Sequence, residues 1–141
     1  MDMVEVTRIS LLKKYPFQCW ETEKFAPEQL NYNEIALAGY KYRWRNEKLY
    51  YCDYLPDGLT QNMQIVKNNP MGFAMMHNQN MLIQKGFKAN FRSAAYMIAL
   101  VYYAKEWKYL KESNNKVVST LALPLGIVLG KRRKKQFAQL D

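Results

Sequence analysis

The sequence contains few of the residues from which enzyme and metal sites are usually built. Its 141 residues include one histidine, His77, and two cysteines, Cys19 and Cys52, which are too far apart for a CxxC pair. A structural or hydrolytic metal site needs three or four His, Cys or carboxylate ligands in close array. We therefore predict no metal ligands, and we interpret His77 as a packed or surface imidazole.

Glycine-rich and nucleophile motifs are also absent. The six glycines are scattered singly, so the sequence has neither a GxxxxGK[ST] nor a GxGxxG loop to bind phosphates, and it has no GxSxG turn. The carboxylate pairs Glu21/Glu23 and Asp53/Asp57 stay open as acid–base groups, although their polar surroundings favour solvated side chains. We predict a protein that is not an enzyme, with no catalytic residue and no cofactor.

The first residues lack the features of a cleaved targeting segment. They carry Asp2 and Glu5, without the apolar core of a secretory signal or the acid-free composition of a transit peptide. Two separate cysteines form no disulfide framework. We therefore expect any import into an organelle to use an uncleaved or internal signal.

Long hydrophobic runs are missing too. A membrane-spanning helix needs about 20 apolar residues, whereas the two charge-free apolar stretches here cover residues 93–104 and 117–130. Each stretch is flanked by Lys or Arg, and stretches of this length are more typical of a buried core. Whether they lie in lipid or in a protein core decides the class of the protein.

The first stretch gains length from the residues that follow it. No helix breaker separates it from residues 105–110, which predicts one continuous helix, and residues 87–112 are assigned to a membrane span with an interfacial aromatic belt. The side chains expected to anchor this span in the membrane are Tyr96, Ile98, Leu100, Val101, Tyr102, Tyr103 and Trp107.

The second stretch is interrupted by Pro124 and Gly126, and it ends at a basic cluster. As a helix its 14 residues would reach about 21 Å, which is short for a span. One span and two spans are both open on the sequence alone. A hairpin of two spans would place its more basic ends on the matrix side.

The net charge of +9 is concentrated near the C-terminal end. Five consecutive basic residues supply +5 of it, and such a run suits an anionic partner, namely nucleic acid, an acidic protein or lipid headgroups. A solvated cluster that aids solubility or topology is the alternative. The candidate contacts for anionic lipid or a partner are Arg92, Lys131, Arg132, Arg133, Lys134 and Lys135.

The first two thirds of the chain are predicted to be peripheral to this membrane region. Residues 1–26 have no sustained period and are expected to form an extended arm, after which Pro27-Glu28 is typical of a helix start. Apolar residues spaced by three and four predict a long amphipathic helix over residues 33–54. Further short helical segments are expected at residues 61–67 and in the second half of residues 59–86, ending near Gly86.

Residues 40–45 support two further interpretations. They alternate aromatic and basic side chains with a period of two, so a strand in a hairpin competes with the helix. Aromatic rings beside Lys and Arg are also a weak indication of nucleic-acid contact, because rings stack on bases and cations neutralise phosphates.

The fold class expected from these features is mainly α. It comprises an extended N-terminal arm at 1–26, a helical peripheral region at 27–86, a transmembrane helix at 87–112, and a second short apolar helix with a basic tail at 113–141.

The order of features from Phe25 to Lys111 resembles the small single-span B-series accessory subunits of the distal membrane arm of mitochondrial respiratory complex I. The likeness covers about 60% of the chain and rests on order and spacing. Its elements are Pro27-Glu28, Leu37-Ala38, the acidic and Tyr-rich segment 47–53, Asn69-Pro70, Asn90-Phe91-Arg92 and Tyr102-Tyr103 within an apolar span. The chain departs from that pattern in its shorter apolar span, in a longer interval between Asn69-Pro70 and Asn90, and in the added segment after residue 113.

This resemblance implies a non-catalytic accessory subunit in the mitochondrial inner membrane. Such a protein scaffolds the membrane arm of complex I within the respiratory electron-transport chain, contacts other subunits and membrane lipids, and contributes to supercomplex contacts. The main alternative is a basic RNA-associated protein such as a mitochondrial ribosomal subunit, which alone would have nucleic acid as its partner. A small soluble interaction module is a third possibility.

Overall fold

The described part of the chain is built from helices. The computed structural model describes residues 6–43 and 63–140, and within these ranges it contains helices and no β-strand. The elements are α1 (Ile9–Lys14), α2 (Gln29–Leu37), α3 (Met63–Asn68), α4 (Pro70–Ile83), α5 (Phe87–Ala104), the 3-10 helix η2 (Trp107–Glu112) and α6 (Lys116–Ala138). The prediction of a mainly helical protein is confirmed.

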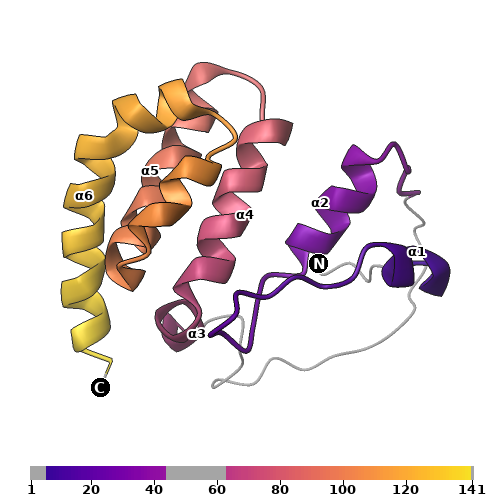
Figure 1. Cartoon of the computed structure of the whole chain (residues 1–141), viewed down its shortest axis with the longest axis horizontal. Helices are drawn as coiled ribbons and strands as arrows, with labels where there is room; N and C mark the ends of the chain where they lie inside the picture. Colours follow the sequence, from indigo (N-terminus) through magenta and orange to yellow (C-terminus); the bar gives the residue numbers. More distant parts are fainter. Residues whose placement is uncertain (1–5, 44–62, 141) are drawn as a thin grey trace.

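Helices α4, α5 and α6 form the packed body of the molecule, with α5 in contact with both of the others (Figure 1). The turn at Gly86, whose φ of +94° suits glycine, reverses the chain between α4 and α5. Helix α6 instead runs parallel to α5. Gly126 lies against Ile98 and Gly130 lies against Tyr102, so the contact positions advance in the same direction along both helices. In the sequence, η2 and its flanking residues connect the end of α5 to the start of α6. They return the chain along α5, so that α6 can run in the same direction as α5.

Small side chains let α6 lie unusually close to α5. A Cβ atom added to Gly126 would be 2.5 Å from Cβ of Ile98, and one added to Gly130 would be 2.7 Å from the Tyr102 ring. Ser119 and Ala122 lie on the same buried side of α6. Stripes of small residues at spacings of three and four allow two helix backbones to approach.

The core lies between these three helices. Six of its buried side chains come from α5, and the remainder come from α4 and α6. The core members are Met71, Ala74, Met81, Ala94, Ala95, Met97, Ile98, Leu100, Val101, Val118 and Ala122.

The N-terminal residues are tied to the start of α4. The Glu23 carboxylate accepts hydrogen bonds from the backbone N–H groups of Met71 and Gly72 at 2.6 and 2.7 Å, so it satisfies two of the free donors at this helix N-terminus. The Asn69 side-chain oxygen accepts from the N–H groups of Lys24 and Phe25. These bonds hold the arm beside α4 although the two are almost 50 residues apart in the sequence.

The expectations for the first part of the chain are confirmed only in part. Residues 1–26 include the short helix α1, which the sequence analysis did not expect. A helix does begin just after Pro27, but it ends at Leu37, and Gly39 with its φ of +89° takes the chain out of the helix. The predicted long helix over 33–54 is therefore confirmed only for residues 33–37 and wrong for residues 38–43. The alternative strand is wrong for residues 40–43, which form no strand, and the remaining parts of both predictions lie outside the described residues.

The predicted continuous helix through residue 110 is also wrong. Helix α5 ends at Ala104, where Lys105 adopts a φ of +62° and the N–H of Glu106 donates to the Val101 carbonyl at 3.2 Å. This is a Schellman closure with lysine in the position that glycine usually occupies. The residues that follow are held by tertiary contacts, including Trp107 against the edge of Tyr102 and Tyr109 against Trp20.

The expected membrane span over 87–112 finds no support in the structure. Within residues 6–43 and 63–140, no helix is both long enough and apolar enough to cross a membrane.

Pro124 does not interrupt the last helix, contrary to expectation. Helix α6 continues from Lys116 to Ala138 with Pro124 inside it. Proline removes one hydrogen bond, to the Thr120 carbonyl, and costs about 3 kcal/mol in a helix interior. Pro124 and Thr120 both lie on the exposed side of α6, where water can serve that carbonyl, while Ala122 and Gly126 pack on α5.

Candidate binding surface

The outward face of α6 carries aliphatic side chains that nothing in the described structure covers. Val117, Leu121, Leu125 and Val128 are 72%, 57%, 43% and 48% exposed. At 100° per residue these four positions fall within about 80° of one another around the helix, opposite the side that packs on α5. We call these four residues the α6 ridge.

Basic side chains continue this face toward the C-terminal end of α6. Lys131, Arg132, Lys134 and Lys135 are all exposed, and we call them the α6 basic end. Lys131, Arg132 and Lys135 lie within about 60° of the α6 ridge at 100° per residue. The outward face is therefore apolar over its first three turns and cationic over its last turns.

Arg133 is the one member of the predicted cluster that turns toward the body of the protein. It is half-buried, its Nη1 lies 4.0 Å from Sδ of Met63, and its guanidinium lies 6.0 Å from the Phe137 ring. Phe137 in turn packs edge-on against Tyr103 at 4.8 Å. Arg133 thus joins α6 to α3, and the other four residues of the basic cluster at 131–135 are exposed to a partner.

The body of the protein is more cationic than the tail alone suggests. Residues 63–140 contain thirteen Lys and Arg residues against Glu106 and Glu112, a net charge of +11. Both carboxylates belong to the segment between α5 and α6, and neither α4, α5 nor α6 contains an acidic residue. The α6 ridge therefore lies on a body whose field attracts anionic surfaces.

The side chains predicted to anchor a membrane span are mostly buried or half-buried within the protein. Ile98, Leu100 and Val101 are buried in the core, and Tyr96 is half-buried and stacks on His77 with ring centroids 5.3 Å apart. Tyr102 and Tyr103 are half-buried against α6, and Trp107 is exposed at one edge. The structure places Arg92 on the exposed surface of α5, apart from the basic end.

His77 is a half-buried imidazole. Burial against Tyr96, with added repulsion from Arg133 and Arg92, lowers the pKa of His77 to about 4. Its Nδ1 atom has no hydrogen-bond partner. No group of three or more His, Cys, Asp or Glu side chains arranged to hold a metal ion occurs in the described ranges.

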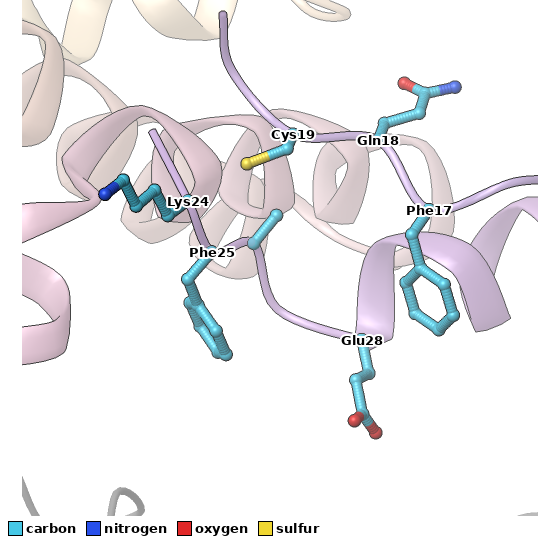
Figure 2. Close-up of a pocket in the computed structure, with 7 residues that line it drawn as sticks. Phe17, Gln18, Cys19, Lys24, Phe25 and Glu28 are labelled. Carbon is cyan, nitrogen blue, oxygen red and sulfur yellow. The ribbon is translucent and has the colours of Figure 1, made fainter. Parts of the chain in front are cut away.

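A shallow hollow beside the arm also lacks a binding constellation. It has a volume of about 320 Å³ and is open to solvent between Phe17 and Phe25. Figure 2 shows that its polar side chains Gln18, Lys24 and Glu28 point in different directions. The Cys19 thiol donates to the Glu23 carbonyl at 3.1 Å. These groups do not converge on a common point where a ligand could be held.

The other residues considered as acid–base or binding groups either make contacts within the protein or lie outside the described residues. The Glu23 carboxylate is committed to the N-terminus of α4, while Asp53, Asp57 and Cys52 lie outside the described residues. The Tyr40 ring packs edge-on against Tyr15 at 6.3 Å. The rest of the aromatic and basic run at 40–45 is described only as far as residue 43, so its proposed stacking on bases stays a prediction.

Comparisons of the chain with protein-family models, with curated proteins and with solved structures find no significant match.

Sequence reasoning named the basic cluster but missed the α6 ridge beside it. The signal was available in the spacing of Ser119, Ala122, Gly126 and Gly130, which marks one side of the helix as the side that packs closely. Once that side is assigned to α5, the leucines and valines opposite it must face outward. The expectation that Pro124 breaks the helix concealed this pattern.

Proposed function

We propose that the chain is a non-catalytic accessory subunit that attaches to a larger assembly through the outward face of α6. The observation that carries this proposal is the α6 ridge, four large aliphatic side chains exposed side by side on one helix face. Contiguous exposed apolar surface on a folded protein commonly marks a site of interaction. The separated polar groups described above offer no competing catalytic arrangement within the described residues.

The assembly that we propose is a mitochondrial inner-membrane respiratory complex, with the membrane arm of complex I as the preferred home. The resemblance in the order of features between Phe25 and Lys111 supports this choice, and the cationic body suits a membrane rich in anionic lipid. The role would be scaffolding, with α4, α5 and α6 as a rigid body and the N-terminal residues packed beside it. Attachment through a helix face needs no membrane-spanning segment.

Native electrophoresis after mild detergent extraction tests this role. The epitope-tagged full chain is expected to migrate with complex I, and the double variant Leu121→Gln/Leu125→Gln is expected to be released from it. Val6→Gln/Ile9→Gln removes two exposed apolar residues from the N-terminal part instead, and this matched control should leave migration unchanged. Migration of the wild-type chain as a free monomer would overturn the proposal.

The net charge of +11 over residues 63–140 favours a second candidate, an RNA-associated subunit of the mitochondrial ribosome. Phosphate contacts make such binding fall steeply as salt rises. This candidate predicts that the chain sediments with ribosomal particles at low salt and is released as the salt concentration increases. Insensitivity to salt together with a need for detergent would exclude it.

A further inference from the structure

We infer that the outward face of α6 binds an anionic lipid surface, with the α6 ridge against the acyl chains and the α6 basic end against the phosphate headgroups. This inference rests on the proposed accessory role and adds to it the chemical nature of one contact surface. It assigns lipid as the partner and an interfacial position as the mode of binding.

The geometry of α6 suits the interface between headgroups and acyl chains. The ridge from Val117 to Val128 is about 17 Å long at 1.5 Å per residue, and its aliphatic side chains carry no hydrogen-bonding group. The opposite side of the helix is closed against α5 by Gly126 and Gly130. Only the outward face is therefore available, and helices of this kind lie in the interface with their apolar side chains a few ångströms below the headgroups.

The charge distribution selects an anionic surface. Lys131, Arg132 and Lys135 continue the ridge on the same face, and α6 contains no acidic residue that would repel a phosphate. The same distribution disfavours a second copy of the chain as the occupant, because two acid-free helices with a cationic end would repel each other when packed face to face.

Nucleic acid fits this face less well than lipid does. The basic end suits phosphates of either kind, but four aliphatic side chains offer no surface on which bases stack. Exposed aromatic rings such as Trp107 lie on η2 rather than on the outward face of α6. A protein groove with an acidic rim would also accept a ridge followed by cations, and the experiment below separates that outcome.

Flotation of the purified full chain with lipid vesicles tests the inference. One vesicle preparation is phosphatidylcholine alone, and the other contains about one third phosphatidylglycerol to supply the anionic charge. The variant Leu121→Gln/Leu125→Gln removes half of the ridge, and Arg132→Gln/Lys135→Gln removes two cations. Val6→Gln/Ile9→Gln and Lys13→Gln/Lys24→Gln make the same chemical changes at exposed positions in the N-terminal part.

The wild-type chain is expected to bind the anionic vesicles at least about tenfold more tightly than the neutral ones. Loss of the two cations should weaken binding about 25-fold, since each cation near such a surface contributes roughly a factor of five. Loss of the two leucines should weaken it by about tenfold or more, an effect that a purely electrostatic contact would not show. Both control variants should stay within about twofold of wild type, because their positions lie outside the proposed surface.

Three results would overturn the lipid assignment. They are absence of binding to anionic vesicles, binding that the leucine variant leaves unchanged, and preferential binding of poly(U) that the Arg132→Gln/Lys135→Gln variant abolishes. Co-migration with a respiratory complex without vesicle binding would reject the lipid site and leave the accessory role standing, with a protein groove as the occupant. Vesicle binding without co-migration would support the lipid site and reject the accessory role.

Discussion

Asn114, just before α6, donates two hydrogen bonds to Asn78 on α4. The backbone N–H of Asn114 donates to Oδ1 of Asn78 at 2.8 Å, and Nδ2 of Asn114 donates to the Asn78 carbonyl at 3.1 Å. The Asn78 Nδ2 group also donates to the Glu112 carbonyl and the Tyr109 hydroxyl. One buried amide thus holds the connection that lets α6 run parallel to α5.

Replacing Asn78 should destabilise the fold strongly. Asn78→Ala removes two donated bonds and one accepted bond and leaves their partners without replacements, so we expect the free energy of unfolding to fall by about 2–3 kcal/mol. Urea unfolding followed by circular dichroism measures this change. Asn114→Ala is the matched comparison, because it deletes one side-chain bond and keeps the backbone bond, and it should cost about 1 kcal/mol. Equal losses for the two variants would contradict the central role of Asn78.

The closeness of α5 and α6 depends on the absence of a side chain at Gly126. A Cβ there would meet Ile98 at 2.5 Å and the Ala95 carbonyl at 3.1 Å, so Gly126→Ala forces the helices apart and should cost about 1–3 kcal/mol despite alanine's better helix propensity. Val128→Ala, at an exposed position two residues further along α6, is the control and should change the stability by less than about 0.5 kcal/mol. A stabilised Gly126→Ala protein in thermal unfolding would show that the close approach does not exist.

His77 should make the protein less stable in mild acid. Its pKa is about 4 in the folded protein and 6.5 ordinarily, so between these values the unfolded chain binds the extra proton. The free energy of unfolding should therefore fall by up to about 3 kcal/mol as the pH is lowered from 6.5 toward 4. Urea unfolding across this range measures the slope, and NMR titration of the imidazole measures its pKa directly.

The variant His77→Phe provides the control for this pH dependence. It keeps an aromatic ring to stack on Tyr96 and should lose the acid-dependent slope. Glu23 acts in the opposite direction, because burial raises the pKa of its carboxyl and so favours the folded state when that carboxyl is protonated. An imidazole pKa near 6.5 in the folded protein would contradict the desolvation of His77.

Lys105 occupies a backbone conformation that glycine adopts at lower cost. Its φ of +62° closes α5, and Lys105→Gly should raise the free energy of unfolding by about 1 kcal/mol because glycine has no Cβ to crowd the left-handed region. Lys108→Gly is the matched control within η2, where glycine only adds chain entropy to the unfolded state and should destabilise slightly. Thermal unfolding of both variants distinguishes the two positions. A loss of stability in Lys105→Gly would argue against the Schellman closure.

Local signals in the sequence placed several elements correctly. Pro27 and Pro70 stand at or just before the starts of α2 and α4, and Gly86 marks the turn before α5. The expected short helix that ends near Gly86 is confirmed as α4, and the expected helical turns at 61–67 are confirmed as α3 over the described part. Proline and glycine act on the backbone within a few residues, so their effect can be read without knowledge of the fold.

Tertiary contacts decided the features that the sequence analysis missed. Tyr109, just after the end of α5 at Lys105, packs on Trp20, and Gly126, two residues after Pro124, packs on Ile98. Trp20 and Ile98 lie far from these positions in the sequence, so the contacts could not be read from the neighbouring residues. The same holds for the cap that Glu23 provides for α4.

The sequence by itself determined that the protein is helical and that its last third combines two apolar stretches with a concentrated positive charge. Only the tertiary structure decided which apolar stretch is covered. Residues 93–104 are largely enclosed between α4 and α6, whereas the α6 ridge within residues 117–130 faces outward. Periodicity shows which side chains share a face of a helix, but what covers that face depends on the neighbouring helices. Here the small residues of α6 pack on α5 and leave the four side chains of the α6 ridge facing away from the core.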